Sequence, residues 1–117
     1  MSSRRPDPRG RGRQIAATAP IFAALGDETR LGLVTRLASG DALSIARLTE
    51  DTRLTRQAVT RHLEVLAEAG LVRGSRRGRE HVWRLEPARL ALARRSLGQI
   101  ERWWDEKLGA LKASLEP

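Results

Sequence analysis

An amphipathic helix pattern over residues 55–69 is followed at once by two short strand patterns. Thr55 is a favourable N-cap, and Val59, Leu63 and Leu66 fall at the i, i+4, i+7 spacing of one helix face. Gly70 supplies a C-terminal stop. Residues 71–76 and 80–85 then read as strands around the tip Arg77-Gly78-Arg79, where glycine can take the positive φ that a hairpin needs. The segment is therefore expected to fold as a helix followed by a small hairpin.

A second, shorter helix pattern lies just before this one. Ser44 can cap a helix over residues 45–51, with Ile45 and Leu48 turned inward. Thr52-Arg53-Leu54 forms a tight turn, and we expect Leu54 to fill the core beneath it. Two helices joined by a tight turn and followed by a basic hairpin are typical of a winged helix-turn-helix.

Two further helices are expected upstream. Thr18 can cap a short helix with Pro20 in its first turn, ended by Gly26. Asp27 then caps a helix reaching about Ala38, with Leu31, Val34 and Leu37 as its buried stripe, and residues 42–43 can add a very short strand. The fold class is mainly α with a small β-hairpin.

The last helix pattern is unusually long for so small a protein. It opens with Pro87 and can run to Leu115, about 44 Å at 1.5 Å per residue. Its apolar stripe, widened by Trp103, consists of Leu90, Leu97, Ile100, Trp104, Leu108, Leu111 and Leu115. We expect this face to join two chains, with Ile21, Phe22 and Leu25 of the first helix on the same surface. Two alternatives stay open: the helix folds back on its own core, or Trp103 and Trp104 line a ligand pocket.

The chain carries a formal net charge of +8, concentrated in two blocks. Residues 1–14 hold five Arg against Asp7, and residues 53–84 hold eight Arg against three Glu. Arginine suits phosphates and guanine edges, so this distribution favours a polyanionic partner over a merely solubilising surface.

These helix, strand and charge patterns divide the chain into three parts. Residues 1–14 are expected to be a disordered basic tail, residues 15–86 a winged helix-turn-helix domain, and residues 87–117 a dimerisation helix.

The sequence has no cysteine, no apolar run that could span a membrane and no signal-peptide pattern, which favours a cytoplasmic protein. No catalytic constellation and no cofactor motif is recognisable, so an enzyme is not expected.

The start of the 55–69 helix carries the side chains suited to reading DNA. Because Val59 and Leu63 face inward, their polar neighbours must face solvent, where a helix in the major groove reads bases. The expected contacts to double-stranded DNA are Thr55, Arg56, Gln57, Thr60 and Arg61 from the helix, and Arg76, Arg77 and Arg79 from the hairpin. A winged-helix module that binds protein instead of DNA is the alternative.

Three segments resemble the ArsR-type (arsenic-repressor-like) bacterial transcription regulators. They are Leu25-Gly26-Asp27-Glu28-Thr29-Arg30, the stretch Thr55 to Leu63 with Leu66, and Ala69-Gly70-Leu71-Val72. The resemblance implies a homodimer that binds an inverted-repeat operator, often as a repressor of its own operon. It also implies that the helix residues above are DNA contacts and that the Arg77–Arg79 tip is the wing.

The metal ligands of this family are missing. Metal-sensing members place Cys-x-Cys in the helix before the recognition helix, but residues 43–47 here are Leu-Ser-Ile-Ala-Arg. Residues 87–115 lack histidine, and Glu101, Asp105 and Glu106 would hold only a hard cation weakly. His62 fits a half-buried position or a phosphate donor, and His81 lies on a wing strand. We therefore expect a member that does not sense metal, and its effector is not indicated.

Overall fold

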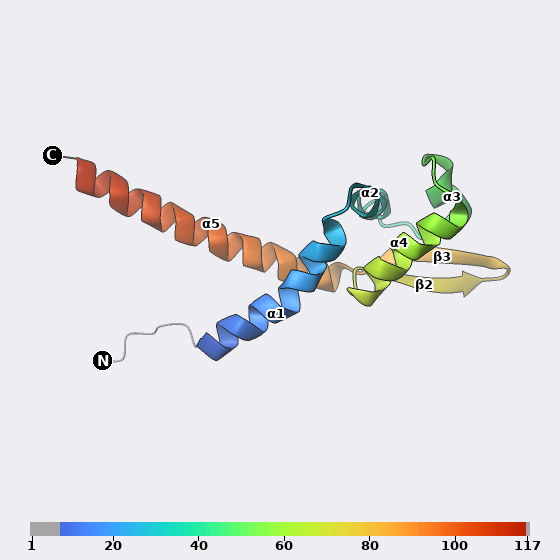
Figure 1. Cartoon of the computed structure of the whole chain (residues 1–117), viewed down its shortest axis with the longest axis horizontal. Helices are drawn as coiled ribbons and strands as arrows, with labels where there is room; N and C mark the ends of the chain where they lie inside the picture. Colours follow the sequence, from blue (N-terminus) through green and yellow to red (C-terminus); the bar gives the residue numbers. More distant parts are fainter. Residues whose placement is uncertain (1–7, 117) are drawn as a thin grey trace.

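The computed structural model describes residues 8–116, with side chains from residue 12 onward. Within these residues, five helices and three strands follow in the order α1 (Pro8–Leu25), α2 (Glu28–Leu37), β1 (Leu43–Ser44), α3 (Ile45–Glu50), α4 (Arg56–Glu68), β2 (Val72–Arg77), β3 (Glu80–Leu85) and α5 (Pro87–Leu115). The strands form one antiparallel sheet in the order β1-β3-β2. Figure 1 shows α2–α4 and the hairpin at one end and α5 projecting from them. The predicted winged helix-turn-helix class is confirmed.

Side-chain caps fix where α2, α3 and α4 begin. An Asp27 carboxylate oxygen accepts the backbone N–H of Arg30 at 3.0 Å. The hydroxyls of Ser44 and Thr55 accept from the third residue beyond them at 3.2 and 3.1 Å. Each cap satisfies a backbone donor that a helix leaves without a partner, which for Thr55 is worth about 1 kcal/mol. All three predicted caps are confirmed.

The core lies between the helices and the sheet. The stripe of α4 is confirmed, because Val59, Leu63 and Leu66 are fully buried. The other large, fully buried side chains come from α1, α2, α3 and the turn before β2: Ile21, Leu37, Leu48 and Leu71.

Two predicted core residues are wrong. Leu31 is 51% exposed, and α2 buries Leu33, Val34 and Leu37 instead. A spacing of three falls roughly 60° short of a full helical turn, so the predicted stripe drifts off the buried face. Leu54 is 37% exposed. Its turn is held by polar contacts, since Thr52 Oγ1 donates to the Thr49 carbonyl and accepts the Leu54 N–H.

The first helix begins much earlier than the sequence indicates. The predicted disordered tail is wrong from Pro8 onward, since α1 starts there, and residues 1–7 lie outside the described part of the chain. Thr18 is no cap but a buried mid-helix residue, and its hydroxyl accepts a hydrogen bond from Ser96 on α5 at 3.3 Å. Pro20 lies inside the helix without an N–H to donate. Packing of Ile21 and Ala24 into the core offsets that local cost.

Helix α5 has the predicted bounds, with Pro87 at its first position. Its proximal part packs against α1 and buries Ala93, whereas every residue from 99 to 116 is exposed. The molecule is consequently elongated, with extents of 67 × 31 × 21 Å. Among residues 8–116, no helix has the length and apolar character needed to cross a membrane.

Candidate nucleic-acid interface

The N-terminal end of α4 presents polar side chains to solvent. Arg56, Gln57 and Arg61 are exposed, as is the cap residue Thr55, while Thr60 is half-buried. The Thr60 hydroxyl donates to the Arg56 carbonyl at 2.8 Å. The one hydroxyl donor is therefore used within the helix, so toward an external partner the oxygen can only accept, and the methyl group suits an apolar contact. These five side chains share one end of one helix, as the sequence predicts.

One arginine that the sequence analysis did not single out links α2 to the end of α3. Arg36, near the end of α2, donates from its guanidinium to the carbonyls of Arg47 and Leu48 at 3.0 and 3.2 Å, and lies 3.5 Å from the Asp51 carboxylate. These contacts satisfy carbonyls at the C-terminal end of α3, where a cation is favourable. The only signal in the sequence was a basic residue close to a helix end.

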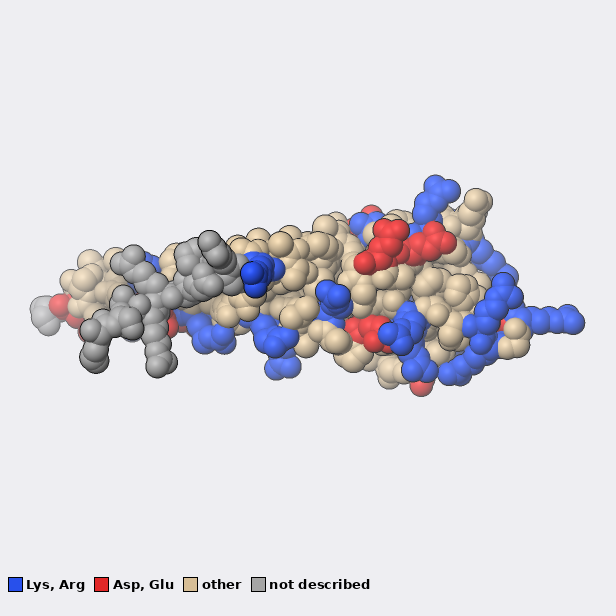
Figure 2. All heavy atoms as spheres, turned by 90° about the horizontal axis from the view of Figure 1, so that it is seen from below, with Lys and Arg blue, Asp and Glu red and all other residues tan. Residues whose placement is uncertain are grey.

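The hairpin places its arginines at a tight tip. Arg77 pairs with Glu80 across the strands, and Gly78 between them has φ +63°. Arg76, Arg77 and Arg79 are all exposed. Figure 2 shows Lys and Arg gathered at the end of the molecule where Figure 1 places this hairpin and α4. The two predicted groups of DNA contacts thus lie at the same end.

The base of the hairpin depends on a second glycine. A Cβ at Gly74 would come within 2.6 Å of the His81 ring and 3.0 Å of the Trp83 ring. Trp83 is 4% exposed, and His81 stacks on it with ring centroids 4.6 Å apart. A side chain at position 74 would force these rings to shift, so the close packing of β2 on β3 favours glycine there, which the strand pattern alone does not reveal.

A cluster of polar contacts links α4 to the corner between α1 and α2. The Arg30 guanidinium donates to the Ala24 carbonyl at 2.7 Å and lies 3.3 Å from His62 Nδ1. Because a guanidinium can only donate, Nδ1 of His62 is the acceptor. The Asp27 carboxylate lies 3.8 Å from the same nitrogen. The hydrogen bond from the Arg30 N–H, helped by the Arg30 charge, lowers the pKa of Asp27 below its ordinary 3.8. His62 is thus half-buried, one of its two predicted settings.

The apolar residues expected to join two chains separate into two groups. Ile21 is only 1% exposed and belongs to the chain's own core, and Leu25 packs partly against that core. The remaining residues are at least 36% exposed: Phe22, Leu97, Ile100, Trp103, Trp104, Leu108 and Leu111. Lys107 lies over the Trp103 ring at 5.2 Å. The described residues contain no cluster of three or more His, Cys, Asp or Glu able to hold a metal ion.

Comparisons with known proteins agree with this geometry. Residues 25–75 match a family described as a helix-turn-helix domain. The HTH-type transcriptional regulator Rv2034 of Mycobacterium tuberculosis is 40% identical over 87 residues, covering 74% of this chain and 78% of the relative. The arsenical resistance operon repressor of Escherichia coli is 32% identical over 95 residues, 81% of each chain.

The solved structures give the same result. An ArsR-like transcriptional regulator from Rhodococcus sp. RHA1 is 36% identical and superposes with a TM-score of 0.74 over 89% of this chain and 97% of its own. Sequence relatives above 30% identity that are covered over most of their length, together with this shared fold, lead to one conclusion. The chain belongs to the ArsR-type family of winged helix-turn-helix transcriptional regulators.

Proposed function

We propose that this regulator is a homodimeric repressor that binds an inverted-repeat operator in double-stranded DNA and works in the cytoplasm. The observation that carries the proposal is the exposure of Arg56, Gln57 and Arg61 at the start of a helix whose opposite face is fully buried. That arrangement lets the first turns of a helix enter the major groove. The relative from Escherichia coli is itself called an operon repressor.

Each DNA-facing side chain has a role that follows from its chemistry. Arg56 or Arg61 can form two hydrogen bonds to guanine, Gln57 can do the same with adenine, and the Thr60 methyl can contact thymine. The N-terminal end of α4, with Thr55, suits a phosphate. Arg76, Arg77 and Arg79 on the hairpin suit phosphates or the minor groove. Helix α4 would therefore supply sequence preference, and the hairpin would supply affinity.

The homodimer is supported by the exposed stripe of α5. Ile100, Trp103 and Trp104 are each about three-fifths exposed. Apolar patches of this length are rare on monomers, and a second copy would remove them from water. A dimer would also present two α4 helices to two half-sites about one turn of DNA apart.

A gel-shift titration with the DNA upstream of the chain's own gene tests the proposal. Such regulators often control the operon in which they lie, so we expect one discrete complex with this DNA. A scrambled duplex of equal length and composition should bind at least about 10³-fold more weakly at physiological salt. Equal affinity for both duplexes would contradict specific readout and would favour the protein-binding alternative.

A further inference from the structure

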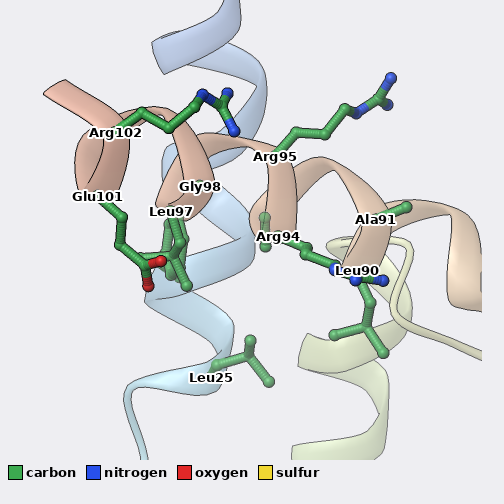
Figure 3. Close-up of a pocket in the computed structure, with 11 residues that line it drawn as sticks. Leu25, Leu90, Ala91, Arg94, Arg95, Leu97, Gly98, Glu101 and Arg102 are labelled. Atoms are coloured by element: carbon green, nitrogen blue, oxygen red, sulfur yellow. The ribbon is translucent and has the colours of Figure 1, made fainter. Parts of the chain in front are cut away.

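The last residues of α1 make contacts in two directions. Leu25 lines the open groove toward α5, and Figure 3 shows its side chain beside that groove. The carbonyl of Ala24, one residue earlier, instead accepts a hydrogen bond of 2.7 Å from the Nε–H group of Arg30 on α2. The backbone N–H of Arg30 is bonded in turn to the Asp27 carboxylate. Arg30 is therefore tied to α1 and to the start of α2 at once.

The guanidinium of Arg30 also reaches α4. Its Nη1 lies 3.3 Å from Nδ1 of His62, which must be the accepting nitrogen, so the proton of the neutral ring is on Nε2. Arg30 and His62 are both half-buried, which shields their contact from water. One side chain of α2 thus joins the end of α1 to the middle of α4.

This contact on the flank of α4 bears on how the helix presents its exposed side. Val59, Leu63 and Leu66 anchor the opposite face in the core. Apolar packing is non-directional, whereas a hydrogen bond has a preferred distance and angle. The contact between Arg30 and His62 therefore constrains rotation of α4 about its own axis. Arg61, a proposed DNA contact, is the residue next to His62.

Protonation of His62 would break the contact. Its Nδ1–H would then face a guanidinium that also can only donate, and two positive groups would lie 3.3 Å apart. The Asp27 carboxylate lies 3.8 Å from the same nitrogen, and it is ionised near neutral pH because its pKa lies below its ordinary 3.8. The imidazolium would therefore move toward Asp27, to the roughly 2.8 Å of a charge-assisted hydrogen bond, and give up the contact with Arg30.

The other charged groups around His62 are exposed or engaged elsewhere. Among residues 12–116, Asp27 is the only carboxylate that pairs with the ring, and residues 20–26 of α1 carry no charge. The remaining acidic side chains of α2, α3 and α4 are all exposed: Glu28, Glu50, Glu64 and Glu68. Arg36 is bound to the end of α3. The nearest other basic side chains of α3, α4 and β2 are exposed: Arg47, Arg56, Arg61 and Arg73.

We propose that Arg30 is a positioning residue for DNA reading, which holds α4 through neutral His62, and that protonation of His62 releases the helix. This rests on the contact between α4 and DNA proposed above. Affinity for the operator should therefore fall as the pH decreases from 8.0 to 5.5, the range in which histidine ordinarily changes charge.

The direction of this change distinguishes the proposal from simpler effects of charge. If His62 were a phosphate donor, its added positive charge in acid would strengthen binding to DNA. The same holds for His81, the other histidine of the chain, and for the N-terminal amine. Weaker binding in acid is thus expected only if protonation of His62 disturbs α4.

Gel-shift titrations at pH 8.0 and pH 5.5 and constant ionic strength test the proposal, with the DNA upstream of the chain's own gene. The unmodified chain should bind about tenfold more weakly at pH 5.5, as expected for loss of a hydrogen bond to a charged group. His62→Asn keeps an acceptor but cannot titrate, so its affinity should not fall in acid. His81→Gln should still show the fall.

Arg30→Lys keeps the positive charge but lacks the fork that joins two acceptors. Its affinity at pH 8.0 should resemble that of the unmodified chain at pH 5.5, with little further loss in acid. A purely structural role of Arg30 would instead lower both affinities by the same factor and preserve the dependence on pH. Arg102→Lys, at an exposed position of α5, is the matched control and should behave as the unmodified chain does.

Nitrogen-15 spectra of the histidine rings test the contact without DNA. At pH 8.0 the proton of His62 should be on Nε2, and a proton on Nδ1 would overturn the proposal. Circular dichroism at both pH values checks that each variant is folded. Specific binding by the unmodified chain that is equal at both pH values, or stronger in acid, would refute this inference alone. Absence of specific binding at both pH values would refute the proposed function, and the role of Arg30 in DNA reading with it.

Discussion

Arg56 and Gln57 occupy positions where a side chain can be replaced with little effect on the fold. Both are exposed in the first turn of α4, and no hydrogen bond or ion pair within residues 12–116 uses their side chains. Thr55 below them supplies the cap, and Val59 beyond them is fully buried. Stability and the proposed DNA readout would thus depend on different residues of the same helix.

Replacing Arg56 or Gln57 by alanine should therefore weaken DNA binding and leave the stability of the fold unchanged. We expect each change to weaken specific binding by about 1–3 kcal/mol and to relax preference at particular base pairs. Gel shifts against an operator and its single-base variants measure both effects. Glu68→Gln, an exposed position in the last turn of α4, is the matched control and should bind normally. Unchanged affinity and base preference in both alanine variants would contradict the role of α4.

Asp27 should make the stability of the protein depend on pH in the acid range. Its folded pKa lies below its ordinary 3.8, so its charge stabilises the fold above that value. This contribution is lost as pH falls through the lowered folded pKa. Asp27→Asn removes the titrating group but keeps an oxygen that can cap α2.

Urea unfolding of the two proteins from pH 7 to pH 2.5 checks this expectation. The free energy of unfolding should favour the unmodified chain near neutral pH, and the difference should vanish at the acid end. Asp41→Asn, at an exposed carboxylate in the turn before β1, serves as control. A difference that stays constant with pH would show that the Asp27 charge contributes nothing.

Among the elements, α4 and α5 were predictable because their signals are local. Thr55 and Gly70 bracket α4, and Pro87 with a long apolar stripe defines α5. The start of α1 was not predictable, because the Pro and Gly of residues 6–12 favour coil. In the structure the helix nevertheless begins at Pro8, since proline is tolerated at a helix N-terminus. The contacts of Arg36 with α3 and of Arg30 with His62 were also missed. They join residues 11 to 32 positions apart, which no periodicity reveals.

The hairpin should act on DNA differently from α4. Arg77→Ala and Arg79→Ala remove exposed charges from its tip, so binding should weaken on every DNA sequence. The slope of log affinity against log salt concentration should fall by about one unit per lost phosphate contact. Titrations at four salt concentrations measure it, with Arg102→Ala on α5 as a control of equal charge. A slope identical to that of the unmodified chain would exclude contact between the hairpin and DNA.

At the scale of the whole molecule, the surfaces proposed for DNA and for a second copy are well separated. The hairpin and the start of α4 occupy one end of a body 67 Å long, and the free part of α5 extends toward the other. Residues 99–116 contribute nothing to the monomer's core, since all of them are exposed. Changes there can thus report on assembly without disturbing the end proposed to bind DNA.

Thiophilic metals should not control the regulator. The chain has no cysteine and only two histidines, His62 and His81, so it lacks the set of thiolate and imidazole ligands that holds such ions tightly. Micromolar zinc, cadmium or arsenite should leave the operator affinity unchanged in gel shifts. A large loss of binding that a chelator reverses would refute this expectation for zinc or cadmium.

Placing a charge on the free part of α5 should break the dimer and, through it, operator binding. Ile100→Asp puts a carboxylate into the centre of the apolar stripe, where pairing would desolvate it without a partner. Because Ile100 is 61% exposed in the monomer, the fold should survive, with an unchanged circular dichroism spectrum. Sedimentation should show a monomer at micromolar concentration, and operator affinity should fall because two half-sites no longer bind together. Gln99→Asp places the same residue on the neighbouring position, off the stripe, at a cost in helix propensity at least as large, and should remain a dimer. A dimeric Ile100→Asp protein would show that the stripe lies outside the interface, whereas a monomer with full operator affinity would show that a single chain suffices for DNA recognition.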